Sequence, residues 1–93
     1  MTNPKIDKHG NKFWFANGKI HNLSGPAAIF NNGDKTWYQN GKRHRLDGPA
    51  IEWTDRIRSY WINDQPLTED EWESHPLRIE YIIQENLKLI LHD

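Results

Sequence analysis

Short apolar and aromatic runs alternate with turn dipeptides through residues 12–62. The runs are KFWFA, AAIF, KTWYQ, AIEW and RSYWI, which begin at residues 12, 27, 35, 50 and 58. Their length and their aromatic and β-branched content are typical of strands. Asn17-Gly18, Asn32-Gly33 and Asn40-Gly41 lie between them, and both residue types tolerate the positive φ of tight hairpin turns. The pattern predicts an antiparallel β-meander.

The same pattern repeats after 23 positions. Residues 14–27, WFANGKIHNLSGPA, align with residues 37–50, WYQNGKRHRLDGPA, and nine of those fourteen positions are identical. Thr36-Trp37-Tyr38 aligns in turn with Ser59-Tyr60-Trp61. The alignment predicts tandem hairpin repeats at 9–31 and 32–54 and a degenerate third copy at 55–72, all within a single domain over 1–93.

The third copy departs from the pattern at Asn63-Asp64-Gln65-Pro66. Asp64 tolerates positive φ less well than glycine, and Pro66 removes a backbone donor. We therefore expect the meander to end at Trp61-Ile62 without a further regular hairpin.

Residues after 66 read as helical. Thr68 and Glu71 fit a capping box that opens a short helix, TEDEWE, and a longer helix follows over about 76–91. In the longer helix an apolar stripe recurs at the helical period, formed by Ile79, Ile82, Ile83, Leu87 and Ile90. The predicted fold class is α+β, with the C-terminal helix packed on one sheet face and Ile79, Ile83, Leu87 and Ile90 buried there.

Alternation along the strands divides the aromatic side chains between the two sheet faces. Trp14, Trp37 and Tyr60 are expected on one face, and Phe15, Tyr38 and Trp61 on the other. With one face under the helix, the opposite face is expected to stay open or to pair with a second copy of the chain.

Composition and charge add three constraints. The chain has no cysteine, which rules out disulfides and thiolate metal sites. The start, MTNPKIDKHG, lacks an apolar leader, so a cytoplasmic location is expected. Residues 1–63 carry ten Lys/Arg against five Asp/Glu, and residues 64–93 carry two against eight. The acidic tail can pack beside the basic repeats, or the basic part can face an anionic ligand.

The repeat motifs resemble those of known families. The period and the aromatic-x-x-Asn-Gly-Lys motif resemble MORN-type repeats, and Asn40-Gly41-Lys42-Arg43-His44-Arg45-Leu46-Asp47-Gly48-Pro49-Ala50 is similar to the NGK-x-HR-x-DGPA repeats of bacteriophages and some bacteria. The resemblance implies a stack of β-hairpins and, for MORN-type arrays, contact with proteins or lipids. The first copy has Asn22 and Ser24 where the second has Arg45 and Asp47, so a role for that charged pair belongs to the second copy alone.

Several residues are candidates for chemistry. His9, His21 and His44 lack the close spacing of a metal site, and we expect the repeated histidines to hydrogen-bond their own turns. Ser24 and Asp47 are expected to accept backbone N–H bonds in their loops. Glu69, Asp70, Glu71 and Glu73 suit the first turns of a helix and predict no catalytic pair.

The sequence predicts a non-enzymatic accessory module, without cofactor or metal, that binds and modulates a host or bacterial protein. A phage-encoded chain would act in the host cytoplasm, no membrane contact is expected, and a homodimer is an open alternative. A second hypothesis is an RNA, single-stranded nucleic acid or nucleotide binder, because cations interleaved with aromatic rings suit phosphates and bases. The binding candidates under either hypothesis are Trp37, Tyr38, Lys42, Arg43, His44, Arg45, Trp53 and Arg58.

Overall fold

The computed structural model describes residues 3–91. Its elements are β1 (Lys5–Ile6), β2 (Lys12–Phe13), β3 (Phe15–Ala16), β4 (Lys19–Ile20), β5 (Ala28–Ile29), β6 (Lys35–Thr36), β7 (Tyr38–Gln39), β8 (Lys42–Arg43), β9 (Ile51–Glu52), β10 (Arg58–Ile62), β11 (Gln65–Leu67), α1 (Glu69–Glu73) and α2 (Pro76–Leu91). The radius of gyration is 14.5 Å. A compact domain of this length has about 12 Å, so the molecule is elongated.

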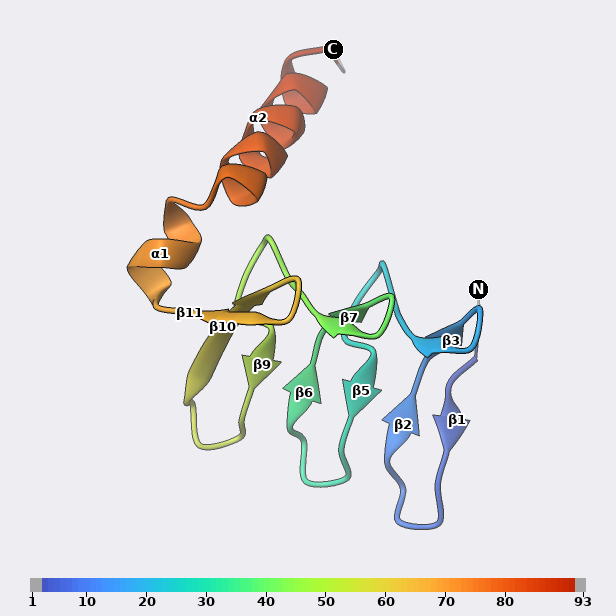
Figure 1. Ribbon diagram of the computed structural model, residues 1–93. Coiled ribbons are helices and arrows are strands. Elements are labelled where there is room, and N and C mark those ends of the chain that lie inside the picture. Colours follow the sequence, from blue (N-terminus) through green and yellow to red (C-terminus); the bar gives the residue numbers. More distant parts are fainter. Residues whose placement is uncertain (1–2, 92–93) are drawn as a thin grey trace.

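The strands form one antiparallel meander with side branches. The seven-stranded sheet has the order β1-β2-β5-β6-β9-β10-β11, and β3-β4 and β7-β8 are separate small hairpins. Figure 1 shows the long hairpins β1-β2, β5-β6 and β9-β10 side by side, with the small hairpins in a second row along one end of the sheet. The expected α+β meander with a C-terminal helix is confirmed.

Strand positions recur along the chain at the spacing of the sequence motif. The pairs β1 and β5, β2 and β6, β3 and β7, and β4 and β8 each begin 23 residues apart. One long hairpin and the small hairpin that follows it therefore form one unit. The first unit is β1–β4, the second is β5–β8 and the third is β9–β11.

The bend between the two rows lies at a tryptophan. Trp14 and Trp37 belong to no strand, and in each case a strand ends just before the ring and another begins just after it. Trp14 N–H donates to Ala27 O at 2.9 Å, and Trp37 N–H donates to Ala50 O at 2.7 Å. Both alanines are completely buried where the two rows meet. The expectation of one continuous strand with alternating rings is therefore wrong for these two copies.

The small hairpins turn at Asn-Gly dipeptides in the left-handed region. Asn17 and Gly18 have φ of 53° and 76°, and Asn40 and Gly41 have φ of 53° and 80°. Positive φ at both central residues matches the twist of the flanking strands, which favours asparagine followed by glycine.

The expectation that the third copy forms no hairpin is wrong. β11 pairs with β10 through a turn at Asn63 and Asp64, with φ of 50° and 68°. Asp64 tolerates this conformation because its carboxylate accepts bonds from the N–H and Nε of Arg43 at 3.1 and 3.0 Å. Pro66 is accommodated because β11 is an edge strand, where a missing donor faces no further strand.

The short helix α1 closes the last unit, and the capping box between Thr68 and Glu71 is confirmed. Trp72 of α1 is buried, and its Nε1 donates to Arg45 O at 2.9 Å. Its ring lies against that of Tyr60, with 4.8 Å between centroids. This tryptophan anchors α1 to the array, the stacked hairpins β1–β11.

The predicted packing of the long helix on a sheet face is wrong. α2 has no buried residue, and Figure 1 shows it directed away from the sheet. Ile79, Ile83, Leu87 and Ile90 are 46%, 51%, 42% and 70% exposed. The buried apolar side chains of the strands and their connecting loops are Ala27, Ala28, Ala50 and Ile62, which lie within the rows of hairpins themselves.

Candidate functional site

The predicted binding residues separate into two groups in space. Tyr38, Lys42 and Arg43 lie on the second small hairpin, β7-β8, with Trp37, His44 and Arg45 at its ends. Trp53 and Arg58 lie instead at the far turn of the β9-β10 long hairpin, where Arg58 Nη1 donates to Trp53 O at 3.1 Å. The structure therefore does not join Trp53 and Arg58 to the Lys42–Arg45 cluster.

Arg43 contacts the third unit. Its guanidinium lies 3.9 Å from the centre of the Trp61 ring, and its Nε is 3.0 Å from Asp64 Oδ1. The backbone N–H of Arg43, followed by its side chain, holds the pKa of Asp64 below its usual range. Both partners stay partly exposed, so the ion pair itself stabilises the junction only weakly.

Arg45 is held more completely. Its guanidinium stacks 3.8 Å from the centre of Trp37 and contacts Asp47 Oδ1 at 2.8 Å and Glu52 Oε2 at 2.9 Å. It also donates to Pro49 O at 3.0 Å, and its side chain is only 18% exposed. An arginine with these partners serves to fix its loop, and a phosphate would have to displace a carboxylate to reach it.

The first copy makes the equivalent loop contact without a charge. Asn22 Nδ2 donates to Pro26 O at 3.0 Å, as Arg45 does to Pro49 O. The expected roles of Ser24 and Asp47 as acceptors of backbone N–H bonds are wrong. Ser24 donates to Asn22 Oδ1, and Asp47 accepts from the Arg45 side chain.

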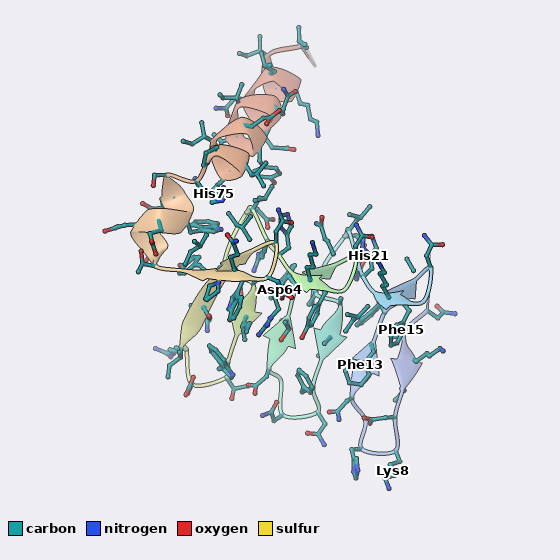
Figure 2. The ribbon with its side chains drawn as sticks, in the orientation of Figure 1. Lys8, Phe13, Phe15, His21, Asp64 and His75 are labelled. Carbon is teal, nitrogen blue, oxygen red and sulfur yellow. The ribbon has the colours of Figure 1, made fainter. Side chains whose placement is uncertain are left out.

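The repeated histidines join consecutive units. His21 Nδ1 accepts from Asn40 N–H at 2.9 Å, and His44 Nδ1 accepts from Asn63 N–H at 3.1 Å. Each histidine side chain therefore bonds the turn of the following unit. The expectation that it bonds its own turn is wrong. Figure 2 shows His21 between the first two small hairpins, on the side of the second turn.

His44 is the more buried of the two, and its pKa is lowered. Burial of the imidazole is the main cause, and the positive charge that His75 can carry nearby is a second. The neutral ring is the form that accepts at Nδ1, so burial favours the state that the junction requires.

A groove opens between the loops of the first two copies. It has a volume of about 400 Å³ and runs between residues 22–25 and 45–47, with Trp37, Gln39, His44 and Tyr81 completing its lining. Tyr81 comes from α2, and burial, together with the nearby Asp47 carboxylate, raises the pKa of its hydroxyl. Sequence reasoning missed this groove because its walls come from both copies of the repeat and from α2, which are far apart in the chain.

The second feature is the apolar stripe of α2. Arg78 and Tyr81 hold the helix to the array, Arg78 by stacking 4.1 Å from the centre of Trp72. Residues two apart on a helix point in nearly opposite directions, so Ile79 and Ile83 face away from Tyr81. Ile79, Ile83, Leu87 and Ile90 are therefore turned outward, whereas Ile82, the fifth residue of the stripe, is half-buried.

Within residues 3–91, no group of three or more histidines or carboxylates could hold a metal ion. No helix in this part of the chain is long and apolar enough to cross a membrane.

Comparison with protein-family models, with curated proteins and with solved structures found no match for this chain.

Proposed function

We propose that this chain is a non-enzymatic protein-interaction module whose contact element is α2. The single observation that carries the proposal is the exposed stripe of Ile79, Ile83, Leu87 and Ile90 on a helix that projects from the array. Contiguous apolar surface on a small protein marks an interaction site, since leaving it in water is unfavourable.

The geometry suits a helix that enters a groove of another protein. The stripe has anchors at positions i, i+4, i+8 and i+11, the spacing with which an amphipathic helix fills an apolar groove. The base of the helix is held through Arg78, which stacks on Trp72 of α1, and through Tyr81, which lines the groove, and Figure 1 shows the last turns directed away from the sheet. The array thus serves as a scaffold from which the helix projects.

Charge favours a protein partner over a membrane surface. A helix that lies on anionic lipid carries lysines and arginines along its polar face. α2 has Glu80 and Glu85 balanced by Arg78 and Lys88, and α1 beside it begins with three acidic residues. Anionic lipid would repel this end of the molecule.

The partner class proposed is a host or bacterial protein in the cytoplasm, in keeping with the resemblance of the repeats to phage and bacterial sequences. The nucleic-acid alternative is less well supported, because Arg43 and Arg45 already contact carboxylates and rings within the chain. Lys42 is exposed and remains available to a phosphate.

The test compares three forms of the full chain immobilised in bacterial lysate. Ile83→Glu with Leu87→Glu places charge in the stripe, and Ile57→Glu is the matched control at another exposed isoleucine. We expect the wild-type chain and the control to retain the same stoichiometric protein, identified by mass spectrometry, and the stripe variant to lose it.

Circular dichroism checks that all three forms are folded, and sedimentation velocity on the pure chain separates a second copy from another partner. A protein retained equally by the stripe variant would place the contact elsewhere. Recovery of RNA without a protein, lost on Lys42→Ala and weakened steeply by salt, would replace the proposal with the nucleic-acid alternative.

A further inference from the structure

Each junction between units is made by the same three hydrogen bonds. At the first junction Asn40 N–H donates to His21 Nδ1 at 2.9 Å, and Gly41 N–H donates to Ile20 O at 2.9 Å. The N–H of Asn22 then donates to Tyr38 O at 3.2 Å. An extended three-residue segment with histidine in its centre therefore docks on the turn of the next unit.

The second junction has the same atoms in the same places. Asn63 N–H donates to His44 Nδ1 at 3.1 Å, and Asp64 N–H donates to Arg43 O at 2.9 Å. Arg45 N–H donates to Trp61 O at 3.2 Å. The flanking residues differ between the two junctions, and the histidine is common to both.

The first unit presents the same turn with no such segment on it. Asn17 and Gly18 have nearly the φ values of Asn40 and Gly41, so their N–H groups are aimed in the same way. Within residues 3–91 no acceptor bonds the N–H of Asn17 or Gly18. No donor in this part of the chain bonds Phe15 O in the way that Asn22 N–H bonds the equivalent Tyr38 O at the first junction.

The space beside this turn is open. A methyl group added at Gly18 would meet no atom within 4 Å, whereas at Gly41 it would meet Lys19 of the preceding unit at 3.9 Å. Phe15 is 39% exposed, and Figure 2 shows its side chain on the first small hairpin, at the end of the row away from the helices.

We propose that this edge, formed by Phe15, Asn17 and Gly18, binds an extended segment of a partner protein that carries a neutral histidine at its centre. The partner's histidine accepts from Asn17 N–H, the carbonyl before it accepts from Gly18 N–H, and the N–H after it donates to Phe15 O. The partner thereby supplies the junction that the two internal units supply to each other, a form of strand addition.

The residue before the histidine is apolar in this partner. At the second junction that position is Arg43, which stacks on Trp61, the counterpart of Phe15. Lys5 already places its Nζ 5.4 Å from the centre of the Phe15 ring, so a second cation would be repelled. At the first junction the residue before the histidine is Ile20, and an apolar residue of this kind suits the Phe15 edge better than a cation does.

A second copy of this chain is a poorer occupant than another protein. The opposite end of the array is closed by α1, whose Trp72 bonds Arg45 O. His21, His44 and His75 already accept backbone N–H bonds at Nδ1, from Asn40, Asn63 and Leu77. These three histidines would have to leave an internal partner to dock on another molecule, and His9 lies in a tight turn directly after the cation Lys8.

The test is an amide NMR titration of the full wild-type chain. The probe is an acetylated and amidated peptide of residues 18–24, Gly-Lys-Ile-His-Asn-Leu-Ser, which contains the segment that docks on the second turn. The Asn17 and Gly18 amide resonances should shift saturably with a dissociation constant of about 1 mM, because a few exposed hydrogen bonds contribute little net free energy. The amides of Asn40, Gly41, Asn63 and Asp64 are internal controls that should not shift.

A peptide with His21→Ala should bind about five-fold more weakly, since it lacks the acceptor for Asn17. Absence of saturable shifts at Asn17 and Gly18 up to about 10 mM peptide, ten times the expected dissociation constant, would overturn the proposal. Equal binding of the alanine peptide would do the same, as would equal shifts at the internal turns. Repeating the titration on the Ile83→Glu, Leu87→Glu chain separates this edge from the α2 proposal, because the shifts should persist there.

Discussion

His44 Nδ1 lies 3.1 Å from the backbone nitrogen of Asn63 and accepts its N–H, which joins the second unit to the third. His44 is only 8% exposed, so water cannot readily replace it as the acceptor. His21 makes the same contact to Asn40 from a more exposed position. The repeated histidine is thus explained by the stacking of units.

Removal of these histidines should weaken the array unequally. We expect His44→Ala to lower the free energy of unfolding by about 1–3 kcal/mol, because a buried donor loses its partner. His21→Ala should cost less, about 0.5–1.5 kcal/mol, since water reaches Asn40. Urea denaturation followed by tryptophan fluorescence measures both.

His9→Ala is the matched control, because the His9 side chain makes no hydrogen bond within residues 3–91. The urea concentration at the midpoint of its unfolding should equal that of the wild-type chain. A His44→Ala midpoint equally close to the wild-type value would show that the contact with Asn63 contributes no stability.

The burial of His44 predicts a dependence of stability on pH. The pKa of His44 is lowered in the folded chain, first by burial and then by His75. The unfolded chain therefore binds a proton at pH values where the folded chain does not, and protonation favours unfolding. The stability from this group is complete above about pH 6.5, the usual histidine value, and is lost as the pH falls below it.

Thermal unfolding at a series of pH values between 8 and 5 measures this dependence. We expect the melting temperature to be level at the upper end and to fall at the lower end. His44→Gln can still accept from Asn63 but cannot titrate, so its melting temperature should fall less. Parallel curves for the two chains would assign the pH dependence to other groups.

Gly48 is required by the position of Arg45. A methyl group added at Gly48 would lie 2.7 Å from Arg45 Cζ, and that guanidinium is held by Asp47, Glu52 and Pro49. Gly48→Ala should therefore destabilise the chain by about 1–3 kcal/mol, as overpacking does.

Gly25→Ala is the matched control at the equivalent loop position. Its methyl group would meet Asn22 Nδ2 at 3.8 Å, an ordinary contact. Chemical denaturation should place this variant within about 0.5 kcal/mol of the wild-type chain. If the two variants were equally stable, the Arg45 side chain would have to move at little cost.

A chain that ends at Ser74 should remain folded. The α2 helix has no buried residue, and its described attachments are the Arg78 stack on Trp72 and the Tyr81 side of the groove. We expect a loss of about 2 kcal/mol or less, the scale of one desolvated cation–π contact. Retained β circular dichroism and a cooperative melt are the readouts, and loss of folding would make α2 a core element.

Features that depend on neighbouring residues were predictable from the sequence. Asn17-Gly18 and Asn40-Gly41 form tight turns because their backbones tolerate positive φ wherever they lie. Thr68 and Glu71 cap α1 because the two groups are three residues apart on one helix. The meander and both helices follow from such local preferences.

Features that depend on which segments meet were decided by the tertiary structure. The periodicity of α2 identified an apolar stripe but could not say that Arg78 and Tyr81 would attach the opposite side to the array. The Lys42–Arg45 sequence suggested an open basic cluster, whereas Arg43 pairs with Asp64 of the third turn and Arg45 pairs with Glu52 of β9 and with Asp47 of its own loop. Asp64 also made the third hairpin possible through Arg43, 21 residues earlier in the chain.

The sequence by itself determined the turns, the helices and the spacing of the hairpins, because these rest on backbone preferences within a few residues. Only the tertiary structure decided that each histidine bonds the following unit, that Arg43 and Arg45 stack on tryptophan rings, and that most of the α2 stripe faces outward. Those outcomes are set by contacts between residues distant in the chain, and a residue's type states what it can bond without stating what it will meet.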